Sequence, residues 1–122
     1  MKTPAVIDAL AALAHEHRLG IYRLLVRQGP AGLPAGVIGE RVGLQPSSLT
    51  FHLQALERAG LVRNQRVSRQ LIYSADYRVM HGLVSYLTDN CCASQPEGAG
   101  EGGCYPAPVL RLVKPARRRK AG

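Results

Sequence analysis

Three cysteines near the C-terminal end of the 122-residue sequence carry its most distinctive chemistry. Cys91 and Cys92 are adjacent, and Cys104 follows a glycine-rich spacer. Adjacent cysteines rarely pair with each other, because the bridge strains the peptide between them. In a chain without a larger disulfide framework, such thiols are better interpreted as metal ligands or redox groups. The sequence therefore predicts a thiol site formed by these three residues.

A second group of side chains lies on a helix predicted to start near Pro46 and to end before Gly60. Its buried face is marked by Leu49, Leu53 and Leu56 at helical spacing. The opposite face presents short hydroxyls, amides and one aromatic ring, from Gln45, Ser47, Ser48, Thr50, Phe51 and Gln54. Such side chains suit close approach to base edges in the major groove of DNA. We expect His52, beside the buried face, to pack or to contact a phosphate rather than to bind a metal.

The elements before this helix are predicted to position it. Apolar residues at helical spacing indicate a helix over about residues 4–14 and a second that ends at Gln28, before a Gly-Pro turn. A short helix over Ala35–Val42 and a tight Gly43-Leu44 turn then lead to Pro46. A short helix, a brief turn with glycine and a longer helix form a helix-turn-helix pattern.

The spacing of the apolar residues changes from helical to strand-like after Gly60. Residues 61–67 and 70–74 are rich in Val, Ile and Tyr, and predict a hairpin that carries Arg63, Arg66 and Arg69. These arginines are expected to bind DNA phosphates. A last helix starts near Asp76 and is apolar over more than one face, which favours packing against a second subunit. The expected fold class is mainly α with a β-hairpin wing (α+β), dimerising through the first and last helices.

Net charge and composition further limit the possible partners and location of the protein. The net charge is +8, and residues 91–122 hold six Lys/Arg and two Asp/Glu, which is half of it. This surplus favours a polyanionic partner. We expect a domain over residues 1–92 and a flexible segment over 93–122 that contains Cys104 and the basic run Arg117–Lys120. Neither a bilayer-spanning run nor a signal peptide is recognised, so we expect a cytoplasmic protein without a membrane partner or organic cofactor.

The segment from Leu44 to Val62, LQPSSLTFHLQALERAGLV, resembles the recognition helix of the ArsR/SmtB family of metalloregulators. The resemblance extends from about Ala9 to Cys92 and includes Ala14-His15-Glu16-His17-Arg18-Leu19. It implies a homodimeric winged-helix repressor, not an enzyme, bound to an inverted-repeat operator in double-stranded DNA.

Three departures from the family's pattern matter. The wing tip has Val67-Ser68-Arg69 where Glu-Gly-Arg is usual, and without glycine we expect the turn not to adopt positive φ readily. The helix before the recognition helix lacks the family's Cys-Val-Cys box. Of the family's zinc site on the last helix, only Asp76 and His81 remain.

The ending Tyr86-Leu87-Thr88-Asp89-Asn90-Cys91-Cys92 resembles a subgroup whose arsenic site lies at the C-terminus. The resemblance implies trivalent arsenic as the inducer, bound by Cys91, Cys92 and Cys104, since soft ions select thiolates. Antimonite should fit the same thiols, methylarsenite needs only two, and cadmium, lead or zinc would prefer a fourth ligand.

Three other functions stay open. One is a redox or persulfide sensor in which Cys92 and Cys104 form a disulfide. Another is a thiol enzyme, which would need a phosphate-cradling loop or a Cys-x-x-Cys motif, and neither occurs here. The third is a DNA-compacting protein that uses the basic tail and responds to no ligand.

Overall fold

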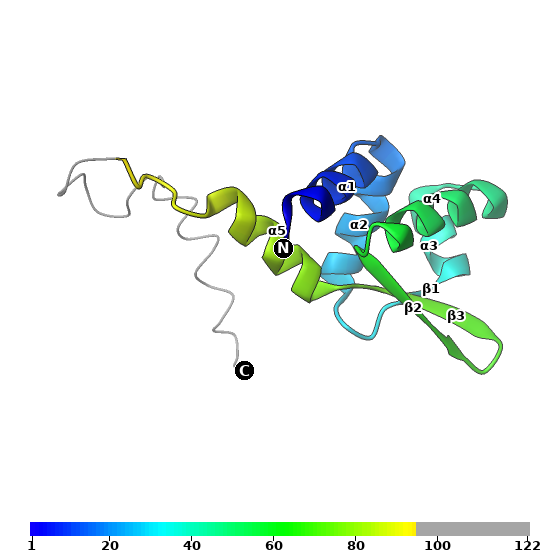
Figure 1. Cartoon of the computed structure of the whole chain (residues 1–122). Helices are drawn as coiled ribbons and strands as arrows, with labels where there is room; N and C mark the ends of the chain where they lie inside the picture. Colours follow the sequence, from blue (N-terminus) through cyan, green and yellow to red (C-terminus); the bar gives the residue numbers. More distant parts are fainter. Residues whose placement is uncertain (95–122) are drawn as a thin grey trace. The chain divides into compact units, whose positions relative to one another are not determined.

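The computed structural model describes residues 1–94, which form five helices and a three-stranded sheet (Figure 1). The chain divides into two units, Met1–Leu87 and Thr88–Gly122. The element order is α1 (Thr3–Leu13), α2 (Glu16–Gln28), β1 (Leu33–Pro34), α3 (Ala35–Val42), α4 (Pro46–Arg58), β2 (Val62–Val67), β3 (Gln70–Ala75) and α5 (Tyr77–Thr88). The expected mainly α fold with a β-hairpin is therefore confirmed. None of these helices is long and apolar enough to cross a bilayer.

The core of the first unit lies where α2, α3 and α4 meet. Its most completely buried side chains are all aliphatic and come from these three helices and the residue before β2: Ile21, Leu25, Ile38, Leu53, Leu56 and Leu61. Removing that apolar surface from water stabilises the packing by about 25 cal/mol per Å². The helix-turn-helix therefore rests on α2 as its support, and the outward face of α4 stays available.

Local sequence explains where α4 begins and ends. Pro46 occupies the first turn, where its missing N–H group leaves no hydrogen bond unmade. Gly60 has φ +81° after the helix, and Leu61 N donates to Leu56 O over 3.0 Å. Only glycine enters this left-handed conformation without a steric penalty, so Gly60 turns the chain from α4 into the wing.

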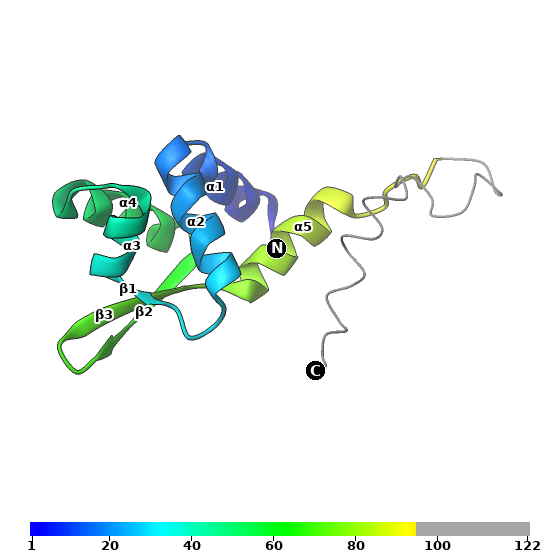
Figure 2. The ribbon, with the colours of Figure 1, turned by 180° about the vertical axis from the view of Figure 1, so that it is seen from behind.

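The sheet has the order β1-β3-β2 and is antiparallel throughout. Strands β2 and β3 pair from Val62 with Ala75 to Val67 with Gln70, and form the hairpin that extends away from the helices in both views (Figures 1 and 2). The two-residue strand β1, which the sequence did not predict, adds Leu33 opposite Tyr73. It attaches the base of the wing to the start of α3.

The wing tip differs from the expectation. Ser68 has φ +57°, so the two-residue turn between β2 and β3 does use a positive φ without glycine. The prediction that this turn avoids positive φ was wrong. A two-residue hairpin loop needs such a residue to match the twist of its strands, and this requirement outweighs the steric cost to serine.

Candidate nucleic-acid interface and thiol site

The recognition surface is the outward face of α4. Leu49, Leu53 and Leu56 are buried as predicted. The predicted DNA-contacting residues other than His52 are exposed, namely Gln45, Ser47, Ser48, Thr50, Phe51 and Gln54. Phe51 has 56% of its surface exposed, which is unusual for a large aromatic side chain. The structure therefore brings these side chains to one solvent-facing surface.

His52 differs from the other predicted contact residues because it is only 8% exposed. Its Nδ1 accepts a hydrogen bond from Nε of Arg18 over 3.2 Å. Burial lowers the pKa of His52, and the neighbouring His15, Arg18 and His17 lower it further. The imidazole is thus held in its neutral form and accepts from the arginine, rather than facing solvent.

Strand β2 and the turn that follows it carry the wing arginines. Arg63 and Arg66 are exposed on β2, and Arg69 is exposed in the turn. Arginine in these positions is free to reach phosphate oxygens beside a groove. Five of the six residues of β2 are exposed, so this strand is a solvent edge of the sheet.

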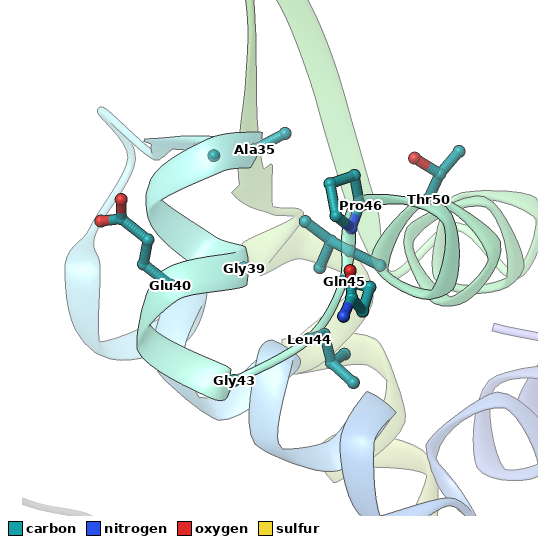
Figure 3. Close-up of a pocket in the computed structure, with 10 residues that line it drawn as sticks. Ala35, Gly39, Glu40, Gly43, Leu44, Gln45, Pro46 and Thr50 are labelled. Carbon is teal, nitrogen blue, oxygen red and sulfur yellow. The ribbon is translucent and has the colours of Figure 1, made fainter.

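A groove of about 450 Å³ runs between α3 and the first half of α4 (Figure 3). Three of the residues that line it, Gly36 and Gly39 of α3 and Gly43 just after that helix, have no side chain. An added Cβ on Gly39 would lie 3.2 Å from Leu49 Cδ2, so the two helices approach closely. Glu40 also lines this groove, and Figure 3 draws its carboxylate on the side of α3 that faces away from α4.

The described cysteines lie just past α5, in the second unit. Cys91 is exposed with a free thiol, and its Sγ is 3.7 Å from Cys92 Sγ. Cys92 is disulfide-bonded. The turn that carries them has positive φ at Asn90 (+58°) and Cys92 (+64°). Cys104 and the basic tail lie outside the described residues, and among residues 1–94 no group of three His, Cys, Asp or Glu side chains is arranged to hold a metal.

Sequence reasoning missed the contacts of Arg18. This residue was noted only as part of the entry into the second helix, but it reaches α4 from α2. Besides its bond to His52, its Cζ lies 5.6 Å from the centroid of the Phe51 ring. The signal in the sequence was the interruption of the apolar pattern by charged and aromatic residues over 15–18.

Comparisons with known proteins agree with this geometry. Residues 13–65 match a helix-turn-helix domain family. The HTH-type transcriptional regulator NmtR of Mycobacterium tuberculosis is 38% identical over 69 residues, which cover 57% of this chain and 55% of that protein. The HTH-type transcriptional regulator YgaV of Escherichia coli is 29% identical over 83 residues, 68% of this chain and 82% of that protein.

Solved structures show the same likeness over about 70% of the chain. An ArsR-like transcriptional regulator from Rhodococcus is 27% identical with a TM-score of 0.61, covering 69% of this chain and 76% of that one. The homodimeric winged helix-turn-helix DNA-binding domain Mb0332 from Mycobacterium bovis is 29% identical with a TM-score of 0.58, covering 71% and 81%. The winged helix-turn-helix fold is therefore confirmed.

Proposed function

We infer that this winged helix-turn-helix chain, a transcriptional regulator of the ArsR-like type, represses transcription as a homodimer on an inverted-repeat operator. The observation that carries the proposal is the outward face of α4, where short polar side chains surround the exposed Phe51. Base edges in the major groove offer partners for Gln, Ser and Thr, and the thymine methyl group offers one for Phe51. The wing arginines supply phosphate contacts beside the groove.

Exposed apolar side chains on two helices support the homodimer. Ile7 on α1 is 58% exposed and Leu87 on α5 is 59% exposed. Thr3 Oγ1 and Tyr86 Oη are 2.7 Å apart, which joins the start of α1 to α5. Large apolar residues gathered in this way mark an interaction surface, and a second copy of the same face would cover them.

The DNA-binding proposal is tested with duplexes selected from a random pool by the wild-type chain. Gln54→Ala should weaken binding to the selected site by about 1–3 kcal/mol if it makes a bidentate base contact, with little effect on random duplex. The matched control is Gln28→Ala, an exposed glutamine at the end of α2. Equal binding of selected and random duplexes by the wild type would favour DNA compaction instead.

We propose trivalent arsenic as the inducer, bound by the reduced thiols of Cys91, Cys92 and Cys104. Cys91 Sγ and Cys92 Sγ lie 3.7 Å apart, so the two sulfur atoms are close enough for one soft ion to bind both once Cys92 is reduced. Binding of arsenic then weakens binding of DNA, and binding of DNA weakens binding of arsenic, by the same coupling free energy of about 1–3 kcal/mol.

The disulfide at Cys92 favours a second candidate, a thiol redox sensor. The two functions separate in a titration of the reduced, operator-bound protein with arsenite, antimonite, cadmium, zinc and peroxide. Release by arsenite in the presence of reductant supports the metalloid sensor. Release by peroxide alone supports the redox sensor.

A cysteine variant tests the three-thiol site. Cys104→Ser should lose most of its response to arsenite and keep its affinity for the operator. Cys91→Ser, which removes another of the three thiols, should behave in the same way. Complete release of Cys104→Ser by the same arsenite concentration as the wild type contradicts a three-thiol site.

A further inference from the structure

Arg18 connects the support helix to the recognition helix. It lies in the first turn of α2, and its Nε donates to His52 Nδ1 on α4 over 3.2 Å. Its guanidinium also lies over the Phe51 ring, with Cζ 5.6 Å from the ring centroid. Because Phe51 is exposed on the outward face of α4, the arginine head group is held at the edge of that face.

The hydrogen bond leaves most of the guanidinium unused. Arginine has five N–H donors, and here only the one on Nε is taken by His52. Within residues 1–94 no protein acceptor is found for the four donors on Nη1 and Nη2. A planar fork of this kind matches two oxygens of a phosphate group.

Three histidines, one arginine and one aspartate lie near the contacts of Arg18. The rings of His15 and His17 lie 4.6 Å and 5.7 Å from the His52 ring, centroid to centroid. On the other side Arg18 lines a shallow depression with Arg58 of α4 and Asp8 of α1. No ion pair between Asp8 and Arg18 occurs in the described part of the chain, so the arginine keeps its charge available.

We propose that Arg18 binds a backbone phosphate of DNA through Nη1 and Nη2, at the edge of the groove that α4 enters. His52 and Phe51 fix the guanidinium from the protein side, and the rings of His15 and His17 lie beside the His52 ring. The inference rests on the proposed DNA-binding function and extends the contact surface from α4 and the wing to α2. As a phosphate contact, Arg18 sets the position of the recognition helix without reading sequence.

The test measures DNA affinity against salt concentration for the wild type and for Arg18→Gln, Arg18→Lys and Arg23→Gln. Arg23 is an exposed arginine on the same helix and is the matched control. Losing one phosphate contact should weaken binding to selected and random duplexes alike, by about fivefold at 0.15 M salt, and reduce the slope of log K against log salt by about 1. Arg18→Lys should restore the slope, and Arg23→Gln should leave it unchanged.

Two kinds of lowered affinity would overturn the assignment of Arg18. One is a lower affinity of Arg18→Gln with an unchanged salt slope, as expected if the residue only supports α4; a melting temperature measured in parallel would then be lowered. The other is a loss confined to the selected duplex, which would mean base contact. If the wild type binds no duplex, both the proposed function and this inference are wrong. If the wild type binds DNA and Arg18→Gln binds it with the same affinity and salt slope, only the inference is wrong.

Discussion

Asn64 on β2 donates a hydrogen bond from Nδ2 to Oε2 of Glu57 on α4. Glu57 is in the last turn of the recognition helix, and Asn64 lies near the start of the wing. The bond therefore joins the two elements that carry the proposed DNA contacts. Both side chains are exposed, so the hydrogen bond contributes little to overall stability. Its main effect is to fix the angle between α4 and β2.

Breaking this bond should weaken DNA binding more than folding. We expect Asn64→Ala and Glu57→Ala each to lower DNA affinity, and the double variant to lose less than the sum of the two, with a coupling of about 0.5 kcal/mol or more. Binding titrations and urea denaturation of all three variants measure this, with Gln65→Ala on the same strand as control. Strictly additive losses would show that the two side chains act separately.

The buried imidazole of His52 makes stability depend on pH. Its pKa is lowered from 6.5, first by burial and then by His15, Arg18 and His17. Below pH 6.5 the unfolded chain takes up a proton that the folded chain does not. The free energy of unfolding should therefore fall as pH drops below 6.5, until the lowered pKa is passed.

Urea denaturation from pH 5 to pH 8 measures this dependence. His52→Gln keeps an acceptor for Arg18 and should flatten the decline, while His81→Gln, at an exposed position on α5, should not. Identical pH profiles for His52→Gln and the wild type would rule out the assignment.

Two tyrosines near the junction of α2 and α5 should respond in opposite ways to loss of the hydroxyl. Tyr22 Oη is buried and has no hydrogen-bond partner within residues 1–94, and burial, Asp76 and Tyr77 raise its pKa to about 12. Tyr77 Oη donates to the backbone carbonyl of Val26 over 3.0 Å. Removing an unpartnered hydroxyl relieves desolvation, while removing a bonded one strands its acceptor.

We expect Tyr22→Phe to leave stability unchanged or raise it by up to about 1 kcal/mol, and Tyr77→Phe to lower it by about 0.5–1.5 kcal/mol. Chemical denaturation of the two variants under one condition gives the comparison. A larger loss for Tyr22→Phe than for Tyr77→Phe would mean that the Tyr22 hydroxyl has a partner after all.

Gly32 permits the close approach of β1 to β3. Its φ is +72°, and an added Cβ would lie 2.4 Å from the carbonyl oxygen of Tyr73. Since that oxygen belongs to the backbone, relief requires the strands to separate. Gly32→Ala should cost at least about 2 kcal/mol.

Gly20→Ala is the matched control for this substitution. Gly20 lies within α2 and nothing is within 4 Å of its added Cβ, so alanine should stabilise the helix by about 0.5–1 kcal/mol. Thermal unfolding of both variants measures the two changes in stability. A Gly32→Ala protein as stable as the wild type would contradict the predicted clash with Tyr73.

The sequence predicted those elements that carry a local signal. The bounds of α3 were predicted without error, because Pro34 and Gly43 stand at its two ends. Strand β1 was missed because two residues show no alternation, and only their pairing with Ile72 and Tyr73 defines a strand. Positive φ at Ser68 was missed because the demand for it comes from hairpin twist rather than from the residue itself.

The candidate sites also differ in whether a local sequence pattern predicts them. The exposed face of α4 followed from its helical period, so its residues could be named in advance. The pairing of Arg18 with His52 joins positions 34 apart in sequence, and no period within either helix reveals it. His52 was expected beside the buried face, but its neutral state depends on burial that only the packed helices create.

The glycines of α3 have a consequence for the timing of hydrogen exchange. Gly36 and Gly39 occupy two of the eight positions of this helix, and each lowers its intrinsic helicity by about 1 kcal/mol relative to alanine. Its amide protons are then shielded from solvent deuterium mainly by packing against neighbouring elements, as where Leu49 and Leu44 lie close to Gly39. α3 is thus expected to open before α4 in isolated protein, and to exchange more slowly once DNA holds the two helices together.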